Sequence, residues 1–402
     1  MKNSSSVNLP IGIALLPIIF LVLLLSINVF IYGDDSLNGT NQFILILSGL
    51  FGASIGFIYK VSYKKILTSI SNSVKSVTGA LLILLFVGAL AGTWMISGII
   101  PSMVYYGLKI LDPNIFLPAC VIICSIISVA TGSSWTTSAT VGIALVGIGK
   151  ALGIPAGMVG GAVIAGAYFG DKLSPLSDTT NLAAAVTKVD LFKHIKYLTY
   201  TTIPSITITF IVFIILGFLQ VSDGTTDNTY LLTAITEKFN ISLVLFIVPL
   251  LVLIMIIKKT PPLIALVIGT LTGALFSIIF QPQIISELSS GYNSRLIDTY
   301  VVIMNTITGP INIETNYEIL NDLFSTGGML GMMNTIFLVI GTMVFGGVMD
   351  AIGALNTISK TLLKWADTSF KLFASTVASC LALNVSASDQ YLSIVVSGKM
   401  FE

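Results

Sequence analysis

Two carboxylates and an ammonium group share the short segment "GAYFGDKLSPLSDTTNLAAA" (166–185), although the chain around it is strongly apolar. Carboxylate, hydroxyl and amide oxygens are hard ligands that suit a hard cation such as Na⁺. The segment therefore predicts an ion site in which two aspartates supply the negative charge and their neighbours supply neutral oxygens. The residues assigned to it are Asp171, Asp178, Thr179, Thr180 and Asn181.

Pro175 predicts a break in the helix between the two aspartates. Proline has no N–H, and its ring crowds the carbonyl four residues earlier, here that of Asp171. The residue before a proline, here Ser174, is also disfavoured in the helical region. We expect the helix to open at 171–175 and to present carbonyl oxygens to the ion. Lys172 is expected to be a charge partner, which either pairs across the cavity or keeps a carboxylate ionised while the site is empty.

A second interruption is predicted in "SVATGSSWTTSATVGIALVGIG" (128–149), where seven of the ten residues at 131–140 are Ser or Thr. One or two hydroxyls in a span can bond back to their own helix. Seven favour a turn or re-entrant tip that lines a polar cavity, because non-helical backbone at membrane depth must be covered by protein or water. Helix packing through small residues is the alternative. The neutral oxygens expected from this segment are those of Ser133, Ser134, Thr136 and Thr137.

Composition indicates which solvent these motifs face. The chain is 55% hydrophobic and 9% charged, with a mean hydropathy of +0.98, whereas soluble domains carry roughly 25% charged residues. Runs long enough to cross a hydrocarbon core of about 30 Å recur throughout. They lie at 9–32, 42–59, 78–100, 196–219, 240–257, 261–280 and 329–350, with further spans or half-spans in 113–150, 156–187 and 370–400. The sequence thus predicts an all-α polytopic membrane protein embedded in the lipid bilayer.

Several other classes of protein are excluded. The net charge of +1 gives no support for nucleic-acid binding. Cys120, Cys124 and Cys380 have neither CxxC spacing nor partner histidines, so we interpret them as small helix residues. The only histidine, His194, lies among lysines at a membrane boundary. Neither GxSxG nor a Walker A pattern is present, so the sequence predicts no enzyme activity and no cofactor.

The positions of the lysines indicate how the predicted spans are oriented across the membrane. They gather after the second span, before 196–219, between 257 and 261, and after 329–350, whereas 33–41 and 222–229 contain neither Lys nor Arg. The positive-inside rule places the lysine-rich loops and the N-terminus in the cytoplasm. We expect a location in the cell membrane, the inner membrane of a bacterium.

An internal similarity predicts two inverted units. "LLFVGAL" (84–90) and "FLVIGTM" (337–343) align at an offset of 253 residues, and the charge pattern gives the two spans opposite directions. This is typical of inverted-repeat secondary transporters with interrupted helices and re-entrant hairpins. The predicted organisation is a two-helix segment at 1–60, a first transport repeat at 61–220, connecting helices and an external loop at 221–316, and a second repeat at 317–402. The offset puts a counterpart of Asp171 near position 424, so we expect the second repeat to be incomplete.

Two aspartates and one segment can each be interpreted in two ways. Asp389 falls at the repeat position of Thr136, so it is either a third carboxylate at the same centre or the base of a cytoplasmic hairpin. Asp350 ends a span near lysines and is interpreted as a boundary charge. The segment 171–181 could itself be a surface loop, but its flanks are small and apolar, and a carboxylate within the membrane is by default a functional candidate.

Two segments together resemble a known family. "TGSSWTTSATVG" followed by "GAYFGDKLSPLSDTTNLAAA" is similar to the NhaC-type Na⁺/H⁺ antiporters of the ion transporter superfamily. Supporting matches are "VGALAGTWMISGIIP" (87–101) and "SDQYLSIVVSGKMF" (388–401), so the resemblance covers 60–402. It implies exchange of cytoplasmic Na⁺ for external H⁺. The family also includes exchangers that move malate and lactate with H⁺ and Na⁺.

The function expected is therefore a secondary antiporter in which Na⁺ and H⁺ compete for intramembrane carboxylates. Removing a carboxylate from water disfavours its charged form, so such a group can accept a proton near neutral pH. A sodium- and proton-coupled exchanger of organic acids is the alternative, and an ion channel is a further one. A homodimer is left open beside a monomer.

Overall fold

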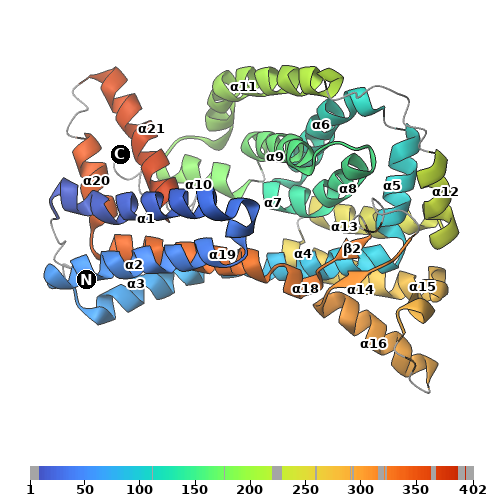
Figure 1. Ribbon diagram of the computed structural model, residues 1–402. Helices are drawn as coiled ribbons and strands as arrows, with labels where there is room; N and C mark the ends of the chain where they lie inside the picture. The colour runs from blue at the N-terminus through green and yellow to red at the C-terminus, as the bar shows by residue number, and fades with distance from the viewer. Residues whose placement is uncertain are drawn as a thin grey trace. The chain divides into compact units, whose positions relative to one another are not determined.

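The computed structural model describes residues 9–110, 112–175, 177–219, 229–258, 260–289, 291, 294–315, 321, 324–363, 368–387 and 394. Over these residues the protein is built from helices (Figure 1). The described strands are β1 (Ile311–Asn312) and β2 (Ser325–Thr326), which pair antiparallel, with Ile311 opposite Thr326. The prediction of an all-α chain is confirmed.

The helices that the structure describes differ widely in length. In chain order they are α1 (Ile11–Tyr32), η1 (Gly33–Leu37), α2 (Thr40–Ile58), α3 (Tyr63–Ser76), α4 (Thr78–Ile96), α5 (Ile99–Ile110), α6 (Pro113–Thr131), α7 (Ser134–Thr137), η2 (Ser138–Gly142), α8 (Ile143–Ala151), α9 (Ala156–Leu173), α10 (Asp178–Val186), α11 (Leu191–Leu219), α12 (Thr229–Lys238), η3 (Leu243–Phe246), α13 (Ile247–Ile257), α14 (Pro262–Phe280), α15 (Pro282–Glu287), α16 (Arg295–Thr308), α18 (Gly328–Gly331), α19 (Met333–Ala351), α20 (Ala354–Leu363) and α21 (Ser369–Ala387).

Seven of the described helices are long and apolar enough to cross a membrane by length and composition: α1, α2, α4, α6, α11, α14 and α19. Six of them correspond to spans predicted from the sequence. The seventh, α6, shows that the region 113–150 begins with one full-length helix and continues as shorter pieces. The polytopic architecture is thereby confirmed.

The predicted span at 240–257 is not one straight helix. It corresponds to the second of two helical segments, Leu231–Lys238 and Leu243–Ile257, which qualify as a candidate span only as a pair and are bent by 84° at the break between them. Ser242 is extended, and its hydroxyl accepts a hydrogen bond from the Val244 N–H at 3.2 Å. Asn240 is held from outside by Gln281, whose amide exchanges hydrogen bonds with its backbone at 2.9 and 3.0 Å. The Ser242 cap starts a new helix at this point. A hydropathy pattern does not detect such a helix start.

The chain forms two compact units, which we describe separately. The first comprises 1–81, 182–188 and 333–402. In it α19 packs along α2 and α3, and its core gathers side chains such as Phe345, Met349 and Ile352. A Cβ at Gly347 would overlap the Ile70 backbone, so this glycine allows α19 and α3 to approach closely.

The second unit comprises 82–181 and 189–332 and contains the predicted ion site. Its best-packed pair is α6 with α9. Gly166 and Gly170, one turn apart on α9, face the carbonyl oxygens of Val121 and Ser125 on α6, and a Cβ at either glycine would overlap the facing oxygen. Small residues at this spacing let two helix backbones approach closely. The end of α9 that carries Asp171 is therefore held firmly against α6.

The predicted repeats at 61–220 and 317–402 stay a prediction. The two segments that suggested them lie in α4 and α19, and each of these helices is 19 residues long and apolar.

Candidate functional site

The predicted break around Pro175 is present. The helix α9 ends at Leu173, Ser174 is extended with φ −81° and ψ 129°, and α10 begins at Asp178. The Ser174 hydroxyl donates a hydrogen bond to the Val129 carbonyl oxygen at 2.8 Å. This bond fastens the break to α6, so the interruption has a defined position in the second unit.

The hydroxyl-rich segment also interrupts its helix. The helix α6 ends at Thr131, and Gly132 takes the left-handed conformation with φ 67°, which favours glycine. Ser133 is then extended, and its hydroxyl accepts the Thr136 N–H at 3.2 Å, which caps the short helix α7. A π-helical turn, η2, follows at once. Such turns are frequent at functional sites.

Asp171 and Ser134 bring the two interruptions together. The Ser134 hydroxyl donates a hydrogen bond to Asp171 Oδ2 at 2.9 Å. The two side chains are nearly enclosed, with exposed fractions of 2% for Ser134 and 8% for Asp171. An enclosed carboxylate must be neutralised or paired, and a proton or a small cation can do either. Asp171 with Ser134 is accordingly the centre of the candidate site.

The remaining hydroxyls of α7 form hydrogen bonds within their own segment. Thr136 donates to the Ser133 hydroxyl oxygen at 2.9 Å, and Thr137 donates to the Ser133 carbonyl at 2.9 Å. Both threonines are buried. Each of these hydroxyls donates its proton within the segment and keeps lone pairs that can accept. The segment is therefore rich in acceptor oxygens, which suit a cation.

The carbonyls at the Pro175 break are occupied by the chain's own donors. Thr180 donates to the Lys172 carbonyl at 3.1 Å, and Asn181 donates to the Pro175 carbonyl at 2.9 Å. The carbonyl of Asp171 accepts the Ser174 N–H at 3.1 Å. The two side chains predicted only as ion ligands therefore also hold the opened backbone in place. Polar side chains that follow a proline by about one turn are a local signal for such fastening.

The other predicted residues are placed as follows. Thr179 shares a hydrogen bond with Ser177 at 3.1 Å, and Lys172 is exposed on α9. Asp389 lies outside the described residues, as does the side chain of Asp178. Residues that the sequence analysis missed are Ser128, which donates to the Ala167 carbonyl, and Ser174. Both lie within the segments singled out from the sequence, but the contacts that they make depend on α6 and α9 being neighbours.

The candidate site is unlike a transition-metal centre. Among the residues that the structure describes, no group of three or more His, Cys, Asp and Glu side chains could hold a metal ion. Cys120 and Cys124 are buried in the α6 packing. The donor set is one carboxylate with several hydroxyls, which matches an alkali cation passing through as substrate.

In the part of the chain that the structure describes, seven or eight candidate spans and a buried carboxylate between two interrupted helices are the features of a secondary transporter. Comparison with known proteins identifies its family. The model of the Na⁺/H⁺ antiporter family matches residues 166–402, and that match begins with the segment that carries Asp171.

Curated relatives extend the similarity over the rest of the chain. The malate-2H⁺/Na⁺-lactate antiporter of Bacillus subtilis (strain 168) is 36% identical over 387 residues, which are 96% of this chain and 78% of the relative. The Na⁺/H⁺ antiporter NhaC of Alkalihalophilus pseudofirmus is 37% identical over 358 residues, 89% of this chain and 74% of the relative. The arginine/ornithine antiporter ArcD of Halobacterium salinarum is 33% identical over 396 residues, which are 97% of this chain and 77% of the relative. The chain belongs to the Na⁺/H⁺ antiporter family, and it is an antiporter rather than an enzyme.

Proposed function

We propose that this antiporter exchanges Na⁺ for H⁺ at Asp171, with Ser134 as the first oxygen partner of the ion. The observation that carries the proposal is the 2.9 Å hydrogen bond between two buried side chains from different interrupted helices. The NhaC relative at 37% identity is named for exchange of the same two ions, which supports the proposal.

Coupling follows from the single negative charge. Asp171 can be neutralised by a proton or by Na⁺, and either one excludes the other. With the carboxylate ionised and empty, the Ser134 hydroxyl donates to it. When Na⁺ enters, the same hydroxyl can turn so that its lone pair faces the cation. One Na⁺ leaving and one or more H⁺ entering then complete a cycle of alternating access.

The second carboxylate and the direction of exchange are further parts of this proposal. Asp178 begins α10, directly after the Pro175 break, and would place a second charge near the same opening. The distribution of lysines supports an N-terminus in the cytoplasm and export of cytoplasmic Na⁺ across the cell membrane.

A second candidate function is sodium- and proton-coupled exchange of organic acids. The B. subtilis relative named for malate and lactate is 36% identical over almost the whole chain, so the similarity alone does not separate the two substrates. Measurements of proton movement in proteoliposomes distinguish the two functions. A Na⁺ gradient that drives proton movement without any organic acid supports Na⁺/H⁺ exchange, whereas proton movement that requires malate or lactate supports the second function.

The carboxylate itself is tested by Asp171→Asn, which keeps the size of the side chain and removes its charge. We expect loss of Na⁺-driven proton flux with expression retained. Asp350→Asn is the matched control, because Asp350 is exposed and accepts a hydrogen bond from Ser69 in the other unit. Wild-type flux in Asp171→Asn would place the ion elsewhere.

A further inference from the structure

A pocket formed by α14, α15 and α16 shares no residue with the ion site. Its volume is about 490 Å³, within the range of roughly 300–1,000 Å³ that small-molecule sites occupy. It begins at Ile278, next to the C-terminal end of the candidate span α14 at Phe280, so it lies near the end of a span rather than at its middle. Under the lysine pattern this is the external end. A water-borne solute can therefore reach it.

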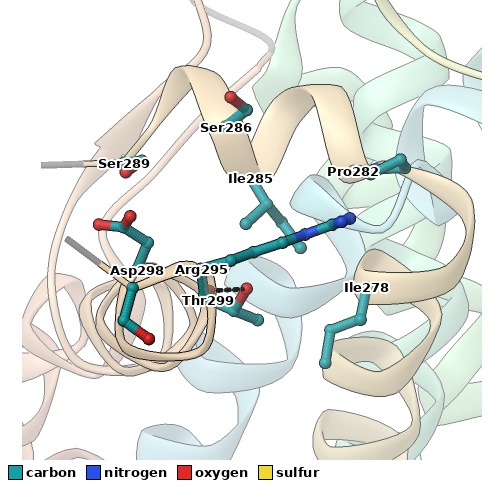
Figure 2. Close-up of a pocket in the computed structure, with 9 residues that line it drawn as sticks. Ile278, Pro282, Ile285, Ser286, Ser289, Arg295, Asp298 and Thr299 are labelled. Carbon is teal, nitrogen blue, oxygen red and sulfur yellow. Dashed lines mark hydrogen bonds between the residues drawn. The ribbon is translucent and has the colours of Figure 1, made fainter. Parts of the chain in front are cut away.

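The pocket holds the chain's single arginine. Of the 19 basic residues, only Arg295 is not a lysine. Figure 2 shows its side chain extending from α16 across the pocket, past Ile285. Among the described residues, no carboxylate lies within ion-pair distance of its guanidinium. A guanidinium presents a planar fork of donors that matches a carboxylate with two parallel hydrogen bonds, which a lysine cannot reproduce.

Neutral donors stand around the same space. Ser294 is the N-cap residue of the 14-residue helix α16, and its side chain makes no capping hydrogen bond. The first N–H groups of this helix carry the positive end of its dipole. Ser289, which accepts the Gly291 N–H at 3.2 Å, and Ser286 line the same pocket. These groups favour an anion.

The remaining lining limits which anion fits. Ile278, Pro282 and Ile285 form an apolar wall that suits a short hydrocarbon chain. Asp298 also lines the pocket, and in Figure 2 it points toward Ser289, away from the guanidinium. A ligand with a second negative charge would meet this carboxylate and be repelled. The lining thus favours one carboxylate at one end of an apolar body.

We propose that the α15–α16 pocket is a second binding site, which takes a small organic monocarboxylate from water, with Arg295 as its bidentate anchor and Asp298 as the group that rejects dicarboxylates. The site is independent of the proposed Na⁺/H⁺ exchange, because it uses neither interrupted helix.

The test is a binding titration on the purified full chain at constant Na⁺ and pH. Butyrate, succinate and butylammonium share a four-carbon chain and differ in charge. We expect butyrate to bind, succinate to bind more weakly, and butylammonium not to bind. Arg295→Gln should weaken butyrate binding by at least about tenfold, as expected when a bidentate charge-assisted pair is lost. Asp298→Asn should reduce the difference in binding affinity between butyrate and succinate.

Two controls separate this site from general charge and from the ion site. Lys238→Gln removes a neighbouring cation that pairs with Glu287 at 2.7 Å outside the pocket, and it should leave butyrate binding unchanged. Arg295→Gln should keep Na⁺-driven proton flux, whereas Asp171→Asn should lose flux and keep butyrate binding. The proposal is overturned if wild type does not bind butyrate, if Arg295→Gln binds it normally, or if Asp171→Asn abolishes the binding.

Discussion

Ser134 is the residue that distinguishes Asp171 from an ordinary buried carboxylate. The hydrogen bond between them crosses from one interrupted helix to the other, and both groups are almost fully enclosed. The hydroxyl can donate to the empty carboxylate or turn a lone pair toward a bound cation. It therefore affects the balance between the empty site and the Na⁺-bound site.

Ser134→Ala tests this balance. Hydrogen bonds to charged groups contribute about 1.5–3 kcal/mol, so we expect the apparent Na⁺ affinity to fall by about tenfold or more at acidic pH, where protons compete better for the carboxylate. Na⁺-dependent flux measured as a function of pH provides the readout. Ser69→Ala is a control, since that hydroxyl also donates to a carboxylate, the exposed Asp350 of the other unit. Equal effects of both substitutions would contradict a special role for Ser134.

At the scale of elements, the contact of α9 with α6 sets where Asp171 stands. Gly166 and Gly170 allow α9 to lie against the α6 carbonyls, and the Ser128 and Ser174 hydroxyls bond across the same interface. The break at Pro175 is then fastened by Thr180 and Asn181. The opened backbone is therefore held in a defined conformation by side-chain hydrogen bonds that precede and follow the proline.

Gly170→Ala tests the helix contact. Its Cβ would overlap the Ser125 carbonyl, and overpacking of this kind costs about 1–3 kcal/mol, so we expect a lower melting temperature and weaker Na⁺ binding. Gly160→Ala on the same helix is the matched control, because its Cβ would meet no atom within 4 Å. That control should be neutral, or stabilising by about 1 kcal/mol through helix propensity. Identical melting temperatures for the two variants would show that close approach of the helices is unimportant.

Pro175→Ala tests the break. The restored N–H can close the helix toward the Asp171 carbonyl, and removing proline from a helix interior is worth up to about 3 kcal/mol. We expect a variant that is no less stable than wild type but binds Na⁺ more weakly, because the geometry of the opening is lost. A thermal-shift titration with Na⁺ compares the two proteins. If sodium stabilises both equally, the opening at 171–175 serves as a gate or loop and does not shape the site.

At the scale of the whole molecule, exchange requires Na⁺ and H⁺ to compete for one site that is reached alternately from the two faces of the membrane. The chain has the membrane-crossing helices for this and belongs to a family of antiporters. Coupling is then a property of the complete transport cycle, and it is measured as the flux of one ion driven by a gradient of the other.

The corresponding prediction concerns pH. Because protons and Na⁺ compete for the same oxygens, the apparent Na⁺ affinity of the wild-type protein should fall as pH drops from about 9 to about 6. The maximal rate should change less than the affinity. Proteoliposome flux over a series of Na⁺ concentrations at each pH gives both quantities. An affinity that is constant over this range would rule out a shared site.

Much of this architecture follows from local sequence. Apolar runs specify six of the seven candidate spans, because length and hydropathy decide what can cross a bilayer. Pro175 and the hydroxyl-rich segment specify the two interruptions, because proline geometry and capping act within a few residues. The bend before α13 was missed, since it depends on Gln281 bonding to the backbone of Asn240 from 41 residues away.

The tertiary structure alone decided which hydroxyl meets which carboxylate. The sequence predicted four hydroxyl ligands of equal standing in the hydroxyl-rich segment, and the structure shows Ser134, 37 residues before Asp171, as the one that donates to it. It also showed that Thr180 and Asn181 hold the opened backbone, and that Arg295 extends across a pocket. Local rules fix where a helix begins and ends, but a contact between distant residues depends on which helices pack together. Here the α6–α9 contact makes that choice, through glycines whose role only the facing carbonyls reveal.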